Sequence, residues 1–278
     1  MTVAEQHTDP LAVHGEGAVW WPTGELRWVD MLAGDVLSLD PAGRITRWHV
    51  GSVAALIRPR RAGGAVVVTE HDVLLADEVG GALTILVSPL HDPEIRLNEG
   101  GCAPDGALYC GTMAYDAGAG RGTLYRVDGS GATTVVLPSV TISNGLAWSP
   151  DGAQAYYVDT PTGRIDVFDA DLRHGRPFAE IPAEAGSPDG LTVDAEGGVW
   201  VALWAGGAVR HYDAAGRLQD VIELPVELVT SCTFGGPRLD QLFITTSRHE
   251  QADPHPAAGA VFSADVGVRG LPVAAFAG

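Results

Sequence analysis

The sequence predicts an all-β protein, a six-bladed β-propeller with four-stranded blades around a central channel. Short runs of alternating apolar and polar residues recur along the 278 residues and are separated by turns that contain glycine. Helical periodicity over a long stretch is nearly absent. Regular short strands allow a sandwich, a barrel or a propeller, and a repeat of 40 to 46 residues favours the propeller.

The repeat is anchored on the glycine of a turn in each unit. Counting back eight residues from this glycine gives a polar residue in four units. The glycines are Gly24, Gly106, Gly152 and Gly197, and the offset residues are Glu16, Asn98, Asn144 and Asp189. Two looser units place Leu56, and either Ser231 or Cys232, at the same offset. The chain therefore holds six units.

Each unit continues into a second pair of strands, as in "GDVLSLDPAGRITRWHV" and "GAVRHYDAAGRLQDVIEL". Six units of four strands make one propeller domain from residue 1 to 278, in which we expect residues 1–12 to be a flexible N-terminal segment. The first strand of each propeller blade lines the channel. Residues at equivalent positions of different blades should therefore meet on the axis.

Asp189 is predicted to belong to such a polar ring and not to a turn. The tripeptide Pro-Asp-Gly occurs at 104–106, 150–152 and 188–190. The first two copies lie between alternating runs, where a hairpin turn belongs. The third precedes a separate turn, "DAEG", five residues further on. Asp189 thus lies inside a predicted strand.

Composition argues against several partners. A net charge of -18 and a pI of about 4.7 argue against nucleic acid, because phosphate binding requires a basic face. Cys102, Cys110 and Cys232 show no paired spacing, so a reducing compartment and a packing role are expected. The sequence shows neither a leader pattern nor an apolar run of 18 residues. These features predict a cytoplasmic protein without a membrane partner, either a monomer or a weak homo-oligomer.

The polar ring of Glu16, Asn98, Asn144 and Asp189 predicts a metal site. Carboxylates leave water only when a partner compensates their charge, and no Lys or Arg occupies the ring offset in any unit. Oxygen ligands suit one divalent ion, Ca²⁺, Mg²⁺ or Mn²⁺, and less exclusively Zn²⁺ or Fe²⁺. The alternative is that these residues cap loops, since Asp, Asn and Gly are ordinary turn formers.

At these residues the chain resembles the SMP-30/gluconolactonase family, which includes regucalcin and bacterial sugar lactonases. The matching segments are "GEGAVWW", "RLNEGGCAPDGALYCGTM", "ISNGLAWSPDGAQAYYVDT", "SPDGLTVDAEGGVWVALWAGGAVRHYD", "LPVELVTSCTFGG" and "LFITTSR". They extend from about residue 13 towards the C-terminus. The resemblance implies a six-bladed propeller, one divalent metal on the axis and hydrolysis of aldonolactones.

The resemblance also implies roles for particular residues. The metal ligands of the family fall on Glu16, Asn144 and Asp189, and its substrate-contacting Arg and Asn fall on Arg96 and Asn98. Relatives commonly have Asp after this Asn, whereas this chain has Glu99, which we expect at the rim of the substrate pocket. A lid-region Glu that contacts substrate in regucalcin has no evident match in "YDAGAGRG", residues 115–122.

These residues predict a sugar lactonase in which a metal ion polarises the lactone carbonyl or activates water. Asp189 is the favoured general base, and Glu16 is the alternative. Two other functions keep the same site: an esterase or phosphotriesterase acting on a different bond, and a calcium- or small-ligand-binding propeller without turnover. Two weaker signals are a zinc site at His249 and His255 and a pocket-lining role for Trp204.

Overall fold

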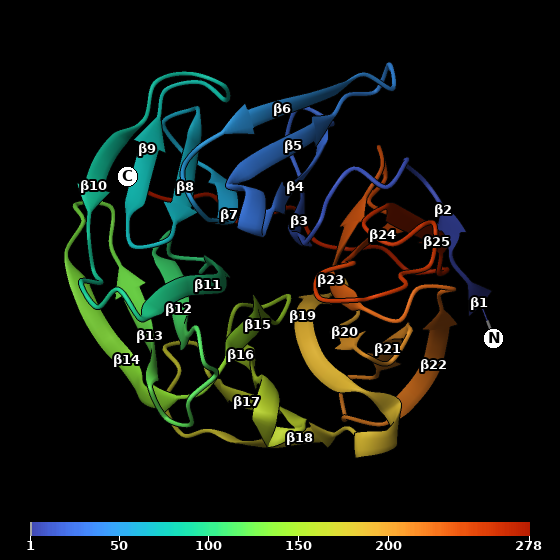
Figure 1. Ribbon diagram of the computed structural model, residues 1–278. Coiled ribbons are helices and arrows are strands. Elements are labelled where there is room, and N and C mark those ends of the chain that lie inside the picture. Colours follow the sequence, from blue (N-terminus) through green and yellow to red (C-terminus); the bar gives the residue numbers. More distant parts are fainter. Residues whose placement is uncertain (1) are drawn as a thin grey trace.

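The computed structural model describes residues 2–278 and confirms the six-bladed β-propeller. Six sheets stand in a circle around a central axis (Figure 1). Three short 3₁₀ helices, η1 (Met31–Ala33), η2 (Thr160–Thr162) and η3 (Ala183–Ala185), interrupt the strands. Among the described residues, no helix has the length and apolar character needed to cross a membrane.

Each blade is an antiparallel sheet whose first strand lies innermost, where it contacts the first strands of the neighbouring blades. The first three blades are β3 (Gly15–Trp20), β4 (Leu26–Asp30), β5 (Asp35–Leu39) and β6 (Ile45–His49); β7 (Ala54–Pro59), β8 (Ala65–Thr69), β9 (Val73–Ala76) and β10 (Thr84–Val87); and β11 (Ile95–Cys102), β12 (Leu108–Ala114), β13 (Gly122–Val127) and β14 (Thr133–Val140). The next two are β15 (Ser143–Trp148), β16 (Gln154–Asp159), β17 (Arg164–Asp169) and β18 (Arg176–Glu180); and β19 (Ser187–Val193), β20 (Val199–Trp204), β21 (Ala208–Tyr212) and β22 (Leu218–Glu223).

The N-terminal segment completes the sixth blade. This blade takes β23 (Val229–Gly235), β24 (Gln241–Thr246) and β25 (Val261–Asp265) from the end of the chain, and β2 (Glu5–Gln6) is its fourth strand, antiparallel to β25. β1 (Thr2–Val3) adds a parallel fifth strand to blade 5 beside β22. Residues 2–3 and 5–6 of the segment that we expected to be flexible therefore form short strands. Two-residue strands have no alternation that a sequence pattern could reveal.

The three Pro-Asp-Gly copies behave as predicted. Asp105 and Asp151 lie in hairpin turns, where each carboxylate accepts a hydrogen bond from the backbone N–H two residues further on. Asp189 lies within β19. The turn of that hairpin is closed by a hydrogen bond from the Gly197 N–H to the Asp194 carbonyl.

A pairing irregularity interrupts every inner strand at a corresponding level. The register shifts lie between Glu16 and Val19, Ala54 and Leu56, Leu97 and Gly100, Ser143 and Leu146, Pro188 and Leu191, and Val229 and Ser231. Such bulges change the direction of a side chain and are common beside active sites. Here they coincide with the predicted polar ring.

Glycine after the polar residue lets neighbouring inner strands approach closely. A Cβ atom at Gly145 would lie 2.7 Å from the Asp189 carbonyl oxygen, and one at Gly190 would lie 2.6 Å from Ser231 Oγ. Contacts this short do not occur for real Cβ atoms. In the Asn-Gly and Asp-Gly pairs, close packing thus requires the glycine. It does not constrain the polar residue, which can face the axis.

Apolar side chains fill the spaces between the blades. The largest cluster joins blades 5 and 6 and includes Trp200, Phe234 and Phe262. All three cysteines are buried and free, as expected for a packing role. These clusters fix the blades around the axis and so fix the level at which the inner strands present their side chains.

Candidate active site

Glu16, Asn98, Asn144 and Asp189 come together on the axis, and all four are at most 6% exposed. We call these four residues the polar ring. Asn98 Nδ2 donates a hydrogen bond of 2.9 Å to Asn144 Oδ1. Asn144 Nδ2 in turn donates to Thr160 Oγ1 at 2.7 Å, so the oxygen of the Asn144 amide is the atom turned towards the ring. The Thr160 hydroxyl donates to the Pro188 carbonyl at 2.8 Å, which links blades 4 and 5 next to Asp189.

Within residues 2–278, neither carboxylate of the polar ring forms a salt bridge with a Lys or Arg side chain. Asp189 Oδ1 is buried and has no hydrogen-bond partner among residues 2–278, whereas Glu16 Oε2 accepts from the Gly17 N–H at 3.2 Å. Burial raises the pKa of Asp189 well above its usual value, and the charges of Glu16 and Glu99 raise it further. Burial also raises the pKa of Glu16, again with a contribution from Glu99. A bound cation would hold both groups ionised.

The donor atoms of Glu16, Asn144 and Asp189 fit a hard divalent cation. They offer two carboxylates and one amide oxygen, the ligand chemistry of Ca²⁺, Mg²⁺ and Mn²⁺. The unpartnered Oδ1 of Asp189 is the kind of buried atom that metal coordination satisfies. Three protein ligands would leave coordination positions for water or a substrate.

The predicted zinc alternative gains no support. Across residues 2–278, no group of three or more His, Cys, Asp or Glu side chains is placed to hold a metal ion. His255 Nδ1 accepts a hydrogen bond from the Ala257 N–H. His249 packs its ring against that of His14, with the centroids 5.5 Å apart.

Arg96 lies beside the polar ring, as the resemblance implied. Its Nη1 donates to Asn98 Oδ1 at 2.5 Å, and the sulfur atoms of Met31 and Met113 lie 3.2 Å from Nη1 and Nη2. The guanidinium is buried, and within the described chain it forms no salt bridge. A thioether is a weak acceptor. Arg96 therefore keeps donor capacity for the oxygen atoms of a ligand.

Glu99 faces a different part of the channel. At the equivalent position, after the polar residue, blades 4 and 5 have glycine. Glu99 and Arg58 line a cavity of about 510 Å³, together with residues of the inner strands that come after the polar ring. Glu99 Oε2 is buried without a hydrogen-bond partner. Burial raises the pKa of Glu99 to about 7, and Arg58 opposes the shift. A role for Glu99 at the substrate rim stays a prediction.

Sequence reasoning missed two groups of residues around the polar ring. His14 Nε2 lies 3.9 Å from Glu16 Oε1, and its Nδ1 lies 2.8 Å from Ser247 Oγ. Burial lowers the pKa of His14 to about 3, helped by the charges of Arg96 and His249, so the imidazole is neutral. Trp204, which the sequence had offered as a pocket-lining residue, packs edge-on against His14 with ring centroids 5.8 Å apart, and its pocket-lining role stays a prediction. The only sequence feature that could have pointed to His14 is its position two residues before Glu16.

The second missed group surrounds Arg96. The aromatic ring of Tyr115 lies over the guanidinium, with its centroid 6.0 Å from Arg96 Cζ. The Tyr115 hydroxyl donates to Glu70 Oε1 at 2.6 Å. Tyr115 lies at the start of the 115–122 segment, in which the sequence had shown only many glycines. No repeat offset marks it, because it follows a second strand and not an inner one.

The inner strands of this six-bladed propeller bring carboxylates, amides and a guanidinium without a salt bridge in the described chain together on the axis. Such a set of polar groups is typical of a site for a small molecule. The family model described as SMP-30/Gluconolactonase/LRE-like region matches residues 14–248. The chain therefore belongs to the SMP-30/gluconolactonase/LRE-like family.

Named relatives cover nearly the whole chain. Pentonolactonase XacC of Haloferax volcanii is 34% identical, and the match covers 93% of this chain and 92% of the relative. A 6-deoxy-6-sulfogluconolactonase of Pseudomonas putida is also 34% identical, with 96% of each chain covered. The crystal structure of a calcium-binding protein, regucalcin, from Agrobacterium tumefaciens superposes with a TM-score of 0.92 at 29% identity over 99% of both chains.

Proposed function

We propose that this protein hydrolyses a sugar lactone to the corresponding aldonic acid with the help of one divalent metal ion. The observation that carries the proposal is the arrangement on the axis. Two buried carboxylates and an amide oxygen converge beside a buried guanidinium that forms no salt bridge with a carboxylate of the described chain. Relatives named as lactonases of pentono- and sulfogluconolactones support the substrate class.

Glu16, Asn144 and Asp189 would hold the ion. When bound, a divalent ion supplies Lewis acidity that polarises a carbonyl oxygen or lowers the pKa of water. Arg96 and Asn98 would bind oxygen atoms of the lactone and fix its orientation. The hydrogen bond between Asn98 and Asn144 keeps the substrate-binding amide in register with the metal-binding amide.

Asp189 would act as the general base, with one of its two carboxylate oxygens for the ion and the other for the proton, and Glu16 is the alternative. In the reaction, water adds to the lactone carbonyl carbon and gives one proton to Asp189. The bond from this carbon to the ring oxygen then breaks, and Asp189 returns its proton to the ring oxygen. The product acid ionises at neutral pH, so each turnover releases one proton.

Proton release from a panel of pentono- and hexonolactones tests the function. The protein is treated with EDTA and then supplied with Ca²⁺, Mg²⁺, Mn²⁺, Zn²⁺ or Fe²⁺ in turn. Metal-restored hydrolysis supports the proposal. A protein that binds a metal but accelerates no lactone would favour the calcium- or ligand-binding function, and hydrolysis of a phosphotriester or simple ester alone would favour the other hydrolase.

Asp189→Asn tests the base, because the amide keeps an oxygen ligand at nearly the same volume but accepts no proton. We expect kcat to fall by about 10²- to 10⁴-fold while calorimetry still detects metal binding. Asp151→Asn, in an exposed hairpin turn, is the matched control and should leave kcat unchanged. If Glu16→Gln abolishes turnover and Asp189→Asn does not, Glu16 is the base.

A further inference from the structure

Tyr115 is the exposed member of a chain of contacts that begins in the polar ring. Asn144 accepts from Asn98, Asn98 accepts from Arg96, and the aromatic ring of Tyr115 lies over Arg96. The inner members are buried, Arg96 being 7% exposed, whereas Tyr115 is 50% exposed. Tyr115 directly follows β12, the end of which pairs with the start of β11 at Arg96. Its ring therefore stands at the surface beside the buried site.

The orientation of the Tyr115 ring is fixed from blade 2. Its hydroxyl donates to Glu70 Oε1 at 2.6 Å, and Ser52 Oγ donates to Glu70 Oε2. The backbone of Glu70 is also tied to the site, because its carbonyl accepts from the Leu97 N–H at 2.8 Å, next to Asn98. The Tyr115 N–H donates to the Glu94 carbonyl at 3.0 Å. An exposed tyrosine is thus held at its backbone and at its hydroxyl.

This arrangement suits a ligand with a carbon skeleton and several oxygens. The face of an aromatic ring packs against C–H groups, while a guanidinium donates hydrogen bonds to oxygen atoms. Tyr115 and Arg96 offer both kinds of surface at the same end of the site, with one face of the ring turned to the guanidinium. A simple charged ligand would need only Arg96, and a purely apolar ligand would leave the charge of Arg96 without a partner.

We propose that Tyr115 determines substrate specificity by packing against the carbon skeleton of the lactone whose oxygens bind Arg96 and Asn98. Glu70 is a positioning residue that holds the ring in place. The inference rests on the proposed function and adds a specificity residue to that site. It favours polyhydroxylated lactones over lactones that are too small to reach from Arg96 to the tyrosine ring.

The test compares Tyr115→Ala, Tyr115→Phe and Glu70→Gln with the wild type on an aldonolactone and on γ-butyrolactone. For Tyr115→Ala we expect KM for the aldonolactone to rise about tenfold, which corresponds to about 1.4 kcal/mol, with kcat within twofold and little change for γ-butyrolactone. Tyr115→Phe and Glu70→Gln keep the ring and should raise KM by two- to threefold. Val135→Ala, an exposed apolar side chain in β14 of the same blade, is the control and should change nothing.

Calorimetric titration of the metal-loaded protein with xylonate and gluconate gives a readout that needs no turnover. Weaker aldonate binding by Tyr115→Ala, again about tenfold, supports the inference even if no lactone is hydrolysed. Wild-type hydrolysis with an unchanged KM in Tyr115→Ala would overturn the inference and leave the proposed function intact. A wild type that neither hydrolyses lactones nor binds aldonates would overturn both.

Discussion

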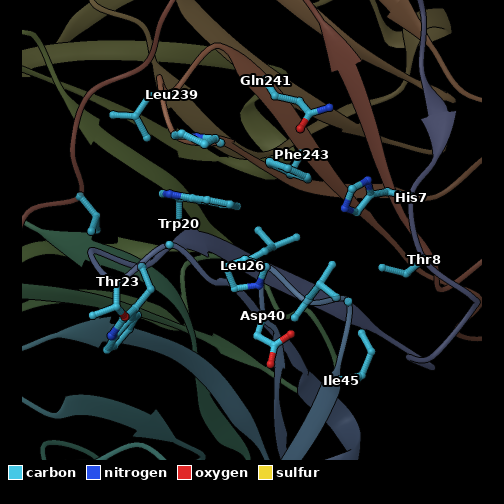
Figure 2. Close-up of a pocket in the computed structure, with 18 of the residues that line it drawn as sticks. His7, Thr8, Trp20, Thr23, Leu26, Asp40, Ile45, Leu239, Gln241 and Phe243 are labelled. Atoms are coloured by element: carbon cyan, nitrogen blue, oxygen red, sulfur yellow. The ribbon is translucent and has the colours of Figure 1, made fainter.

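The seam between blades 5 and 6 and the seam that closes the propeller, between blades 6 and 1, are built differently. Seventeen buried apolar side chains form the cluster between blades 5 and 6. At the closing seam the corresponding cluster has six, among them Leu26, Trp28 and Phe243. Beside it lies a groove of about 1360 Å³, where Trp20 stacks on Phe243 and His7 stands at the edge (Figure 2).

Directional hydrogen bonds replace apolar packing at the closing seam. β2 pairs with β25, Thr230 Oγ1 donates to the Gly15 carbonyl at 2.6 Å, and Arg248 Nε donates to the Ala12 carbonyl at 3.1 Å. The His14–Ser247 contact lies at the same seam. Glu16 belongs to β3 on this seam, so on this side blade 1 is positioned mainly by backbone pairing and polar contacts, while its other side packs on blade 2 through a cluster that includes Val19 and Val29.

The largest effect should follow from removing the strand that closes the propeller. Deleting residues 2–8 removes the pairing of β2 with β25 and of β1 with β22, together with four hydrogen bonds outside these ladders: Ala4 N–H to the Glu223 carbonyl, His7 and Thr8 N–H to the Val261 carbonyl, and Val261 N–H to Thr8 Oγ1. At about 1 kcal/mol each, these four bonds alone should lower the free energy of unfolding by about 4 kcal/mol, and the lost ladder bonds add to this. Urea unfolding followed by circular dichroism measures it.

Deleting residues 2–3 alone is the control for this truncation. It removes β1, which extends blade 5 and does not close the propeller. We expect a loss of about 1 kcal/mol or less. Because the longer deletion includes the shorter one, equal losses would mean that residues 4–8, and β2 with them, add nothing to stability.

Substituting one leucine in each seam by alanine compares the packing of the two seams directly. Leu242 belongs to the cluster between blades 5 and 6, and Leu26 belongs to the closing seam and lines its groove; both are at most 1% exposed. Leu-to-Ala changes in cores cost about 2 to 5 kcal/mol, depending on the cavity they leave. We expect about 4 kcal/mol for Leu242→Ala and about 2 kcal/mol for Leu26→Ala, because a space open to the groove is not a closed cavity. Equal costs in urea unfolding would contradict the difference between the seams.

The sequence was sufficient to predict the fold and the polar ring, because both repeat. A turn glycine and a polar residue eight positions earlier recur in four blades, and the strand periodicity supplies the rest. The closing strand β2 was not predictable, because its pairing with β25 joins residues more than 250 positions apart and is two residues long. His14 and Tyr115 were missed for a related reason: neither lies at a repeated offset, and their neighbours Ser247 and Glu70 come from other blades.

The smallest predicted changes in stability concern two aspartates with lowered pKa values, Asp194 in blade 5 and Asp35 in blade 1. Burial alone would raise the pKa of Asp194, but hydrogen bonds from His211, Trp200 and two backbone N–H groups lower it. Burial likewise opposes the lowered pKa of Asp35, which results from its bonds to Arg47 and His49. The side chains of Arg47 and His49 are 40% and 71% exposed, so solvent screens this second network.

A carboxylate whose pKa is lower in the folded protein stabilises it above the unfolded pKa, near 4, and this contribution disappears as the pH falls through the folded pKa. At pH 7 we therefore expect Asp194→Asn to cost about 2 kcal/mol and Asp35→Asn less than about 1 kcal/mol. Both differences from the wild type should shrink between pH 5 and pH 3 in urea unfolding. A larger pH dependence for Asp35→Asn would show that the charge network of blade 1, next to the closing seam, is the stronger one. The network of Asp35, Arg47 and His49 would then compensate for the thin apolar core of the closing seam more fully than its exposure suggests.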